Sequence, residues 1–234
     1  MSYKESVNQK IEEILNQGAS APYKRFVSDN HKTWIEHCVS HAKIQGIWAE
    51  FGVYRGKTMQ QISKFTSNIV YGFDSFEGLH EDWDVNNPKN VYSLGGIVPL
   101  GALNLEDPYS DLGMYNSRPT ENIIPWSSNV RLIKGFFEDS LPPFLETNNE
   151  AASFLHIDSD LYSSAKTVLS LMKDRIIPGT ILVFDDFPGY PEFTDRNHEV
   201  KAFAEFLLET NKNYKALAIQ PHSSYSQFCY EICQ

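Results

Sequence analysis

The sequence predicts an open α/β fold with a mostly parallel β-sheet that closes on an antiparallel hairpin. Apolar runs at residues 153–157 and 180–184 end in the carboxylates of Asp158 and Asp185, a pattern typical of buried parallel strands. Residues 221–226 separate two later apolar stretches and are too few to hold a crossover helix, so those stretches should pair antiparallel. We therefore expect acidic groups at the carboxyl edge of one sheet, where open α/β folds bind their ligands.

The chain length predicts a single domain. A chain of 234 residues can bury a substantial core in one α/β unit, and we expect one domain over residues 1–234. Apolar residues recur at helical spacing in residues 3–17 and 28–45. We therefore expect a helical preface over residues 1–45, ahead of the first strand.

An alternation of strands and helices follows this preface. Residues 47–51 have a strand pattern, Met59, Ile62 and Phe65 share one helical face, and residues 69–74 form the next strand pattern, which together predict a βαβ unit. The alternation continues with expected strands at 130–134, 153–157 and 180–184, a helix at 197–209, and final strands at 214–220 and 227–232.

Residues 77–129 form a long segment between the second and third expected strands. This segment has neither helical nor strand periodicity, and it contains several Gly, Pro and aromatic residues. Such a long loop is uncommon in a compact domain unless it covers a functional site. We expect a lid or substrate-binding insertion, and a partly disordered segment is the alternative.

The composition argues against several classes of partner. Thirty acidic and twenty basic residues give a net charge of −10, which disfavours nucleic acid because binding phosphates requires Lys and Arg. The sequence shows no bilayer-length apolar stretch and no apolar signal region at its start, so we expect a cytoplasmic protein without a membrane partner. Cys38, Cys229 and Cys233 lack metal-type spacing and are expected to be packed thiols.

A glycine-bearing turn follows the first expected strand. Gly52 and Gly56 lie where a strand passes into a helix, and glycines there allow a ligand to approach the backbone closely. Asp74 ends the next strand 22 residues after Gly52 (74 − 52), the usual place for a carboxylate that binds ribose hydroxyls. The turn lacks both the third glycine of a dinucleotide site and the Walker spacing, so the pattern favours a nucleoside cofactor other than NAD or ATP.

The two acidic clusters predict a cation. Carboxylates of Asp158, Asp160, Asp185 and Asp186 that met at one sheet edge would repel one another, and a divalent ion would keep them charged. Carboxylate ligands suit magnesium, with manganese or calcium as substitutes, and do not suit zinc. Asp160 has a second interpretation as the cap of the following helix. His156 is expected to be a hydrogen-bonded core histidine.

Five segments between residues 47 and 206 carry a family resemblance, in the order EFGVYRGKT, YGFDSFEGL, GFFEDSLP, HIDSDLYSS and PGTILVFDDF. They resemble the macrocin/mycinamicin-type O-methyltransferases, a class I S-adenosylmethionine family that includes sugar methylases of antibiotic biosynthesis. The resemblance implies a seven-stranded Rossmann-like sheet, the donor at its carboxyl edge and a magnesium ion beside it. It also implies methyl transfer to a hydroxyl of a small-molecule acceptor, such as a sugar or another diol.

The resemblance also implies roles for individual residues. The methionine end of the donor would be lined by Glu50, Gly52, Val53, Tyr54 and Gly56, its ribose bound by Asp74 and Ser75, and its adenine flanked by Phe137, Glu138 and Asp139. Asp158, Asp185 and Asp186 would bind magnesium. Asp158 would also border the donor, and Asp185 would serve as the general base, so these two are the candidate catalytic residues.

Two alternative functions stay open from the sequence. A methyltransferase could use Asp158 for substrate binding and need no metal. A magnesium-dependent phosphatase of the haloacid dehalogenase type would use Asp158 and Asp160 as nucleophile and acid, but it would leave the Gly52 turn and Asp74 without a role. The acceptor and the oligomeric state are not determined, and a homodimer or higher homo-oligomer would use the amino-terminal helices by analogy.

Overall fold

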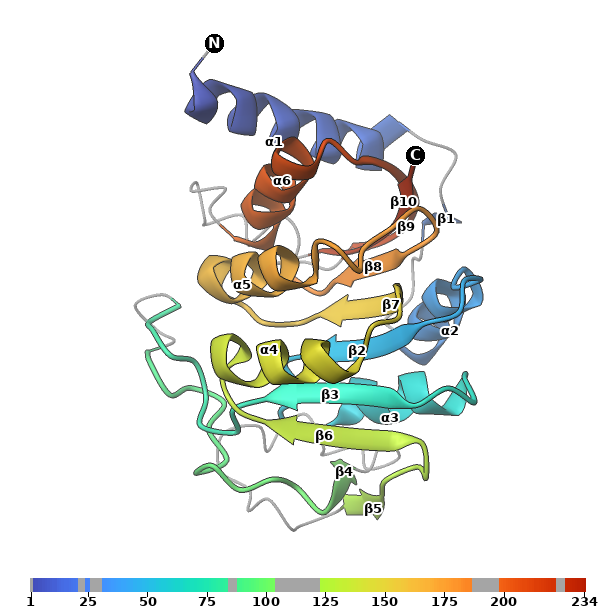
Figure 1. Cartoon of the computed structure of the whole chain (residues 1–234), viewed down its shortest axis with the longest axis vertical. Coiled ribbons are helices and arrows are strands. Elements are labelled where there is room, and N and C mark those ends of the chain that lie inside the picture. Colours follow the sequence, from blue (N-terminus) through green and yellow to red (C-terminus); the bar gives the residue numbers. More distant parts are fainter. Residues whose placement is uncertain are drawn as a thin grey trace.

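The computed structural model describes residues 2–20, 24–25, 31–83, 88–103, 123–186, 198–221 and 226–234. Its main sheet has the strand order β1-β9-β10-β8-β7-β2-β3-β6 (Figure 1). The strands are β1 (Lys24–Arg25), β2 (Ile47–Phe51), β3 (Val70–Asp74), β6 (Val130–Lys134), β7 (Ala152–Ile157), β8 (Ile181–Phe184), β9 (Asn213–Pro221) and β10 (Ser226–Cys233). β10 pairs antiparallel with both β8 and β9, and the other pairings are parallel. The seven expected strands and the antiparallel hairpin are confirmed, and β1 is an additional edge strand.

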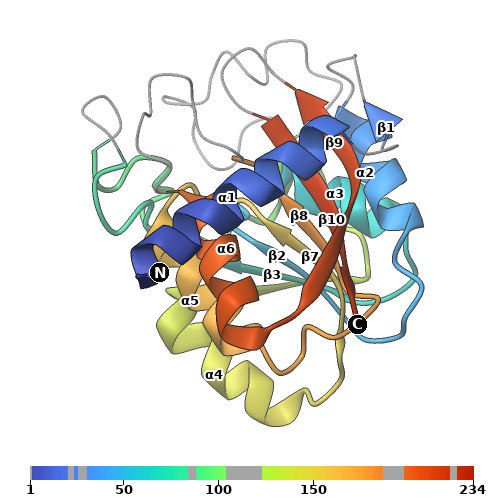
Figure 2. The same ribbon diagram turned by 90° about the horizontal axis from the view of Figure 1, so that it is seen from above.

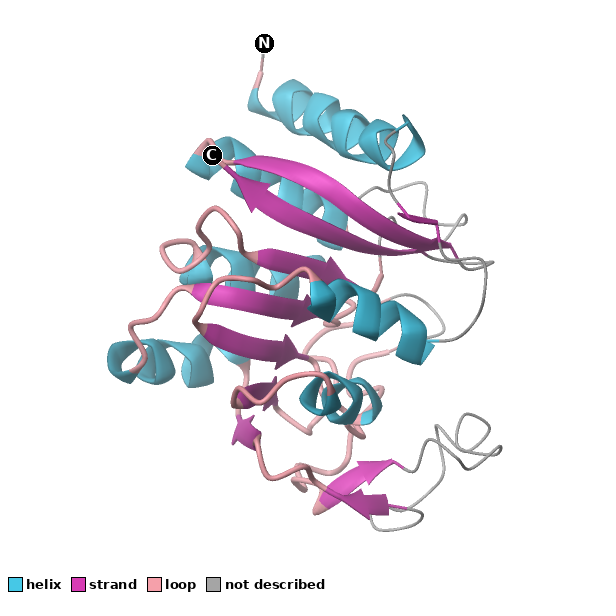
Figure 3. Cartoon of the chain, turned by 90° about the vertical axis from the view of Figure 1, so that its right-hand side faces the viewer, coloured by secondary structure: helices cyan, strands magenta, loops and turns pink. Residues whose placement is uncertain are grey.

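Helices cover both faces of this sheet (Figure 2). They are α1 (Tyr3–Ser20), α2 (His31–Ser40), α3 (Lys57–Lys64), α4 (Phe137–Thr147), α5 (Tyr162–Met172) and α6 (Glu199–Thr210). α4, α5 and α6 lie on one face, with α1 packed against α6, while α2 and α3 lie on the other face. Figure 3 shows these layers from the side. None of the described helices is long and apolar enough to span a membrane.

The central strands are buried on both faces, as their continuous apolar sequences require. Every residue of β2 and of β7 is buried, and successive side chains alternate between two apolar clusters. Trp48 stacks on Phe154 under α2 and α3, with ring centroids 5.2 Å apart. Phe51 stacks on Phe73 at the same distance on the opposite face. This rigid centre carries the loops at the carboxyl edge.

Two helices differ from the sequence-based expectation. The periodic stretch at 28–45 is helical in the structure only over His31–Ser40, and residues 28–30 lie outside the described ranges. α4 was not expected, because Pro142 and Pro143 lie inside it and proline is unfavourable within helices. Phe137, Leu141 and Phe144 of α4 nevertheless contribute to the core, and this tertiary packing outweighs the local cost.

The insertion at 77–129 contains a two-stranded antiparallel sheet. β4 (Gly101–Leu103) pairs with β5 (Ile123–Pro125), apart from the main sheet. Residues 84–87 and 104–122 of the insertion lie outside the described ranges. The role of the segment as a lid stays a prediction, although its two described ends lie against the site described next.

Candidate functional site

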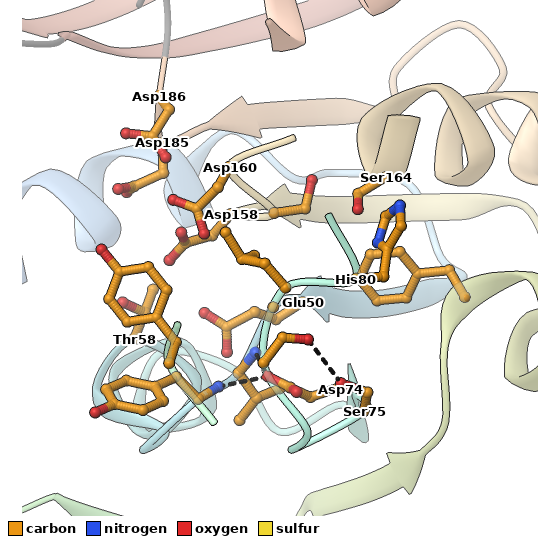
Figure 4. A pocket seen from close by; sticks show the side chains of 18 of the residues that line it. Glu50, Thr58, Asp74, Ser75, His80, Asp158, Asp160, Ser164, Asp185 and Asp186 are labelled. Atoms are coloured by element: carbon orange, nitrogen blue, oxygen red, sulfur yellow. Dashed lines mark hydrogen bonds between the residues drawn. The ribbon is translucent and has the colours of Figure 1, made fainter. Parts of the chain in front are cut away.

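A cavity of about 420 Å³ opens at the carboxyl edge of the sheet. It is bordered by the segments that follow β2, β3, β6, β7 and β8. Figure 4 shows Asp158, Asp160, Asp185 and Asp186 gathered on one side, Asp74 and Ser75 on the other, and Glu50 between them. Of the residues expected at the site, the cavity is lined by Glu50, Gly52, Val53, Tyr54, Gly56, Asp74, Ser75, Phe137, Glu138, Asp158, Asp185 and Asp186.

One expected donor residue is not on the cavity wall. Asp139 lies in the first turn of α4 with an exposed side chain, and it is not among the described residues that line the cavity. The preceding residues Phe136, Phe137 and Glu138 do line it. Because α4 begins at Phe137, its third residue is turned away from the strand ends, which the sequence pattern alone did not reveal.

Asp74 holds the turn after β2 in place. Its Oδ2 accepts hydrogen bonds from the backbone N–H of Val53 at 2.8 Å and of Tyr54 at 2.7 Å, and its Oδ1 accepts one from Phe76 at 2.6 Å. Burial raises the pKa of the Asp74 carboxyl, and these backbone N–H groups oppose that shift by favouring the charged form. Asp74 therefore has a structural task in addition to the ribose contact that its position predicts.

The two glycines of this turn allow close contacts that a side chain would block. A Cβ on Gly52 would lie 1.7 Å from the carbonyl oxygen of Asp158, so the end of β2 touches the end of β7 here. A Cβ on Gly56 would lie 1.9 Å from the ring of Trp126, which comes from the insertion. Tyr54 between them has a left-handed backbone with φ 46°, a conformation that costs free energy and is often found at functional sites.

Three carboxylates converge as the sequence predicts. Each carboxylate contributes one oxygen to a group of three that lie within 4.8 Å of one another, and the residues are Asp158, Asp185 and Asp186. Burial, and then the neighbouring charges, raise the pKa of the Asp158 and Asp186 carboxyls well above the usual value. Both effects oppose ionisation. A divalent cation would reverse them, and a set of carboxylate oxygens fits magnesium.

Asp160 lies beside these three carboxylates, with a hydrogen bond to Asp186, and does not cap α5. The N-cap position is Leu161 and carries no side-chain cap, whereas Asp160 has φ 59° and lines the cavity. Burial raises the pKa of Asp160 to about 7, and a hydrogen bond with Asp186 acts in the opposite direction. The helix-cap interpretation is wrong for Asp160, and its carboxyl is available to the site.

A buried polar row crosses the sheet beneath the cavity. Glu50 and His156 are cross-strand partners, and Glu50 Oε1 lies 3.2 Å from His156 Nδ1. His156 Nε2 lies 3.7 Å from Asp185 Oδ1, which also accepts a hydrogen bond from the side chain of Gln227 on β10. Burial lowers the pKa of His156 to about 4, so the imidazole is neutral near pH 7. His156 is a core histidine as expected. The expectation that it is hydrogen-bonded is wrong, because neither of its buried ring nitrogens has a hydrogen-bond partner among the described residues, and its neighbours are site acids.

Glu199 is a buried member of the site that the sequence analysis did not identify. It is the first residue of α6, and its side chain is fully buried. Oε1 accepts hydrogen bonds from the backbone N–H of Ser159 at 3.3 Å and from its hydroxyl at 3.4 Å, and Oε2 accepts one from the N–H of Asp186 at 3.3 Å. Burial raises the pKa of Glu199, and the backbone N–H groups oppose the shift.

The start of the insertion also contacts the cavity. His80 lines it and lies with Nε2 3.1 Å from the hydroxyl of Ser163 on α5. The same hydroxyl donates a hydrogen bond to Glu81, and the rings of His80 and Phe136 meet edge to face at 6.2 Å. These contacts attach one end of the insertion to α5, while Trp126 attaches the other end to the glycine turn.

Comparisons with known proteins agree with this geometry. The family model described as Macrocin-O-methyltransferase (TylF) matches residues 25–206. A curated relative from Streptomyces olivaceus, 8-demethyl-8-(2,3-dimethoxy-alpha-L-rhamnosyl)-tetracenomycin-C 4'-O-methyltransferase, is 22% identical over 166 residues, or 65% of this chain. The match covers 58% of that relative.

Two solved structures show the same fold. The calicheamicin methyltransferase CalS11 is 17% identical and matches with a TM-score of 0.57 over 99% of this chain and 93% of its own. The O-methyltransferase NovP is 16% identical and matches with a TM-score of 0.57 over 100% of both chains. At this level of identity the likeness establishes the Rossmann-like class I methyltransferase fold.

Proposed function

We propose that this chain, which belongs to the macrocin O-methyltransferase family, transfers a methyl group from S-adenosylmethionine to a hydroxyl group of a small molecule with the help of magnesium. One observation carries the proposal. The oxygens of Asp158, Asp185 and Asp186 lie within 4.8 Å of one another in the same cavity as the Gly52 turn and Asp74. The proposed cation site and the proposed nucleoside site would therefore be adjacent, as a metal-assisted transfer requires.

The donor would lie along the carboxyl edge from β2 to β6. Glu50 and the turn containing Gly52, Val53, Tyr54 and Gly56 would contact its methionine end. Asp74 and Ser75 lie where a ribose would be bound, and Phe136, Phe137 and Glu138 lie where the adenine would rest. Apolar rings at one end and carboxylates at the other match the two ends of this donor.

Magnesium fits the acidic cluster by donor chemistry. Asp158, Asp185 and Asp186 would hold it through carboxylate oxygens. When bound, the ion would lower the pKa of a coordinated hydroxyl and orient it for in-line attack on the methyl carbon. The hydrogen bond from Gln227 to Asp185 Oδ1 orients that carboxylate toward the cavity.

The general base is assigned to Asp185, with Asp160 as a second candidate. A base that also binds the ion loses proton affinity, which limits Asp185 in this role. Asp160 lies outside the three-oxygen set, lines the cavity, and has a pKa that burial raises to about 7, close to the range that suits a general base. The proton from the acceptor hydroxyl would pass to a carboxylate oxygen of one of these two residues.

The name of the curated relative supports a proposal for the class of acceptor. That protein is named as a 4'-O-methyltransferase of a rhamnosyl tetracenomycin, so we propose a natural-product sugar or another diol as acceptor, in antibiotic biosynthesis or a comparable pathway. The insertion brings Trp83 and Tyr92 to the cavity wall, and aromatic faces of this kind suit a bulky acceptor.

Binding and turnover test the proposal separately. Calorimetry with S-adenosylhomocysteine should show one site per chain, and transfer of a labelled methyl group to a panel of rhamnosides and catechols should depend on magnesium. Absence of nucleoside binding would overturn the proposal. Full transfer after exhaustive chelation would instead favour the metal-independent alternative. The phosphatase alternative predicts release of phosphate from an aryl phosphate, and it still leaves the Gly52 turn and Asp74 unexplained.

A further inference from the structure

We propose that Glu199 is a positioning residue that ties together the two acid-bearing turns of the site. The inference rests on the proposed function, because it concerns the acids assigned to the metal. Glu199 accepts hydrogen bonds from Ser159, which lies between Asp158 and Asp160, and from the backbone N–H of Asp186. One carboxylate thus connects the turn after β7 to the turn after β8.

The placement of Glu199 is unusual for the first residue of a helix. A first-turn acid ordinarily lies exposed near the positive end of its own helix. Glu199 is fully buried, and its oxygens accept hydrogen bonds from two other segments. Burying a carboxylate costs free energy unless hydrogen bonds compensate for it. Its three hydrogen bonds oppose that cost and hold the side chain between the two turns.

The hydrogen bonds of Glu199 act on the backbone segments that orient the acidic side chains. The amide that Glu199 holds at Asp186 lies between the carboxylates of Asp185 and Asp186, and the amide at Ser159 directly follows Asp158. On its other side, Asp158 is held by contact with Gly52. Groups that orient metal ligands in this way commonly change metal affinity or activity by about 10–100-fold when removed.

Glu199→Gln is the informative variant, with Glu205→Gln as its matched control. Glutamine keeps the volume but has one acceptor oxygen, so its NH2 group must face one of the two backbone N–H groups and that bond is lost. Glu205 lies on the same helix and is buried to a similar degree. It accepts a hydrogen bond from Tyr162 at 2.8 Å and pairs with Lys166 at 3.0 Å, away from the acids. Both variants replace one buried glutamate of α6 with its amide.

Three measurements test whether Glu199 connects the two turns. The magnesium concentration for half-maximal methyl transfer should rise about tenfold in Glu199→Gln. Hydrogen exchange of the backbone amide that loses its acceptor, at Ser159 or at Asp186, should accelerate in the same variant without any ligand. The dissociation constant for S-adenosylhomocysteine, measured without metal, should stay within about twofold of wild type. Glu205→Gln should leave all three quantities unchanged.

The proposal is overturned if Glu199→Gln keeps wild-type exchange and wild-type magnesium dependence, or if Glu205→Gln produces the same changes. A loss of donor affinity as large as the loss of magnesium affinity would also overturn it, because that would indicate general disorder of the fold. Should Glu199→Gln fail to fold, Glu199→Asp keeps the charge and is too short to reach both turns. If wild type needs no magnesium, the proposed function fails, and the exchange readout still decides the role of Glu199.

Discussion

The backbone carbonyl oxygen of Asp158 lies so close to Gly52 that a Cβ atom on Gly52 would be only 1.7 Å from it. The glycine turn after β2, which we propose binds the donor, is therefore in direct backbone contact with the turn that carries Asp158. This contact links the two halves of the site, and any displacement of one strand end must be transmitted to the other.

We predict that Gly52→Ala disrupts the site and the fold together. Gly52 has φ +94°, and a left-handed backbone costs an alanine about 1–2 kcal/mol before any clash. The overlap with Asp158 adds to this, so we expect a fall of about 3 kcal/mol in the free energy of unfolding. Donor affinity should fall at least about tenfold, which corresponds to about 1.4 kcal/mol. Chemical denaturation and calorimetry measure the two effects.

Gly95→Ala is the control for backbone strain in that experiment. Gly95 also has a positive φ of +64°, but a Cβ there would have no atom within 4 Å. The Gly95→Ala variant should lose about 1 kcal/mol in the free energy of unfolding and keep its donor affinity. Equal effects of the two substitutions would contradict the importance of the contact between Gly52 and Asp158.

We predict that two substitutions of Asp74 separate its structural task from its binding task. Asp74→Ala leaves the N–H groups of Val53 and Tyr54 without their acceptor, and each buried unsatisfied group costs about 1–3 kcal/mol. Asp74→Asn can keep its oxygen toward both N–H groups and loses only the acceptor of the Phe76 N–H, so it should cost less stability than Asp74→Ala, while donor affinity falls through loss of the second acceptor oxygen. Denaturation compared with calorimetry tests this, and equal destabilisation by both variants would refute it.

We predict that Asp185→Asn, which changes a proposed metal ligand, and Asp160→Asn, which changes the second candidate for the general base, have different kinetic signatures. Loss of a metal ligand should raise the half-saturating magnesium concentration at least about tenfold. Loss of the general base should lower kcat by about 10²–10⁴-fold with little change in that concentration. A magnesium titration of initial rates at saturating donor distinguishes the two. Wild-type turnover in Asp185→Asn would remove Asp185 from both roles.

We predict that chelation abolishes methyl transfer without releasing the donor. The acids of the cluster lie on the opposite side of the cavity from Asp74 and Ser75, so donor binding should persist in EDTA within about threefold, or about 0.6 kcal/mol. Magnesium or manganese should restore activity, and zinc should not, because carboxylate sites favour hard cations. Restoration by zinc alone would contradict the assigned ligand chemistry.

The sheet and much of the site could be predicted because their signals are local. Apolar runs that end in Asp74, Asp158 and Asp185 specify buried strands and the edge at which their acids meet. The convergence of Asp158 with Asp185 and Asp186 followed from the strands being adjacent, and the structure confirms that adjacency.

The remaining features depend on packing between distant segments. Glu199 resembles an ordinary first-turn acid in sequence, and its burial becomes evident only when α6 is placed over the turns after β7 and β8. α4 contains two prolines that local propensity disfavours. Asp160 precedes two serines like a helix cap, but its positive φ directs it into the cavity instead.

The hydrogen bond from Gln227 to Asp185 joins residues 42 positions apart in the chain. During synthesis on a ribosome, the acids of the cluster all emerge before the strand that carries Gln227. A nascent chain that ends before residue 226 would thus bear the complete set of aspartates but lack one of the groups that orients Asp185. Catalytic competence should consequently arise late in translation, after the last hairpin has added to the sheet.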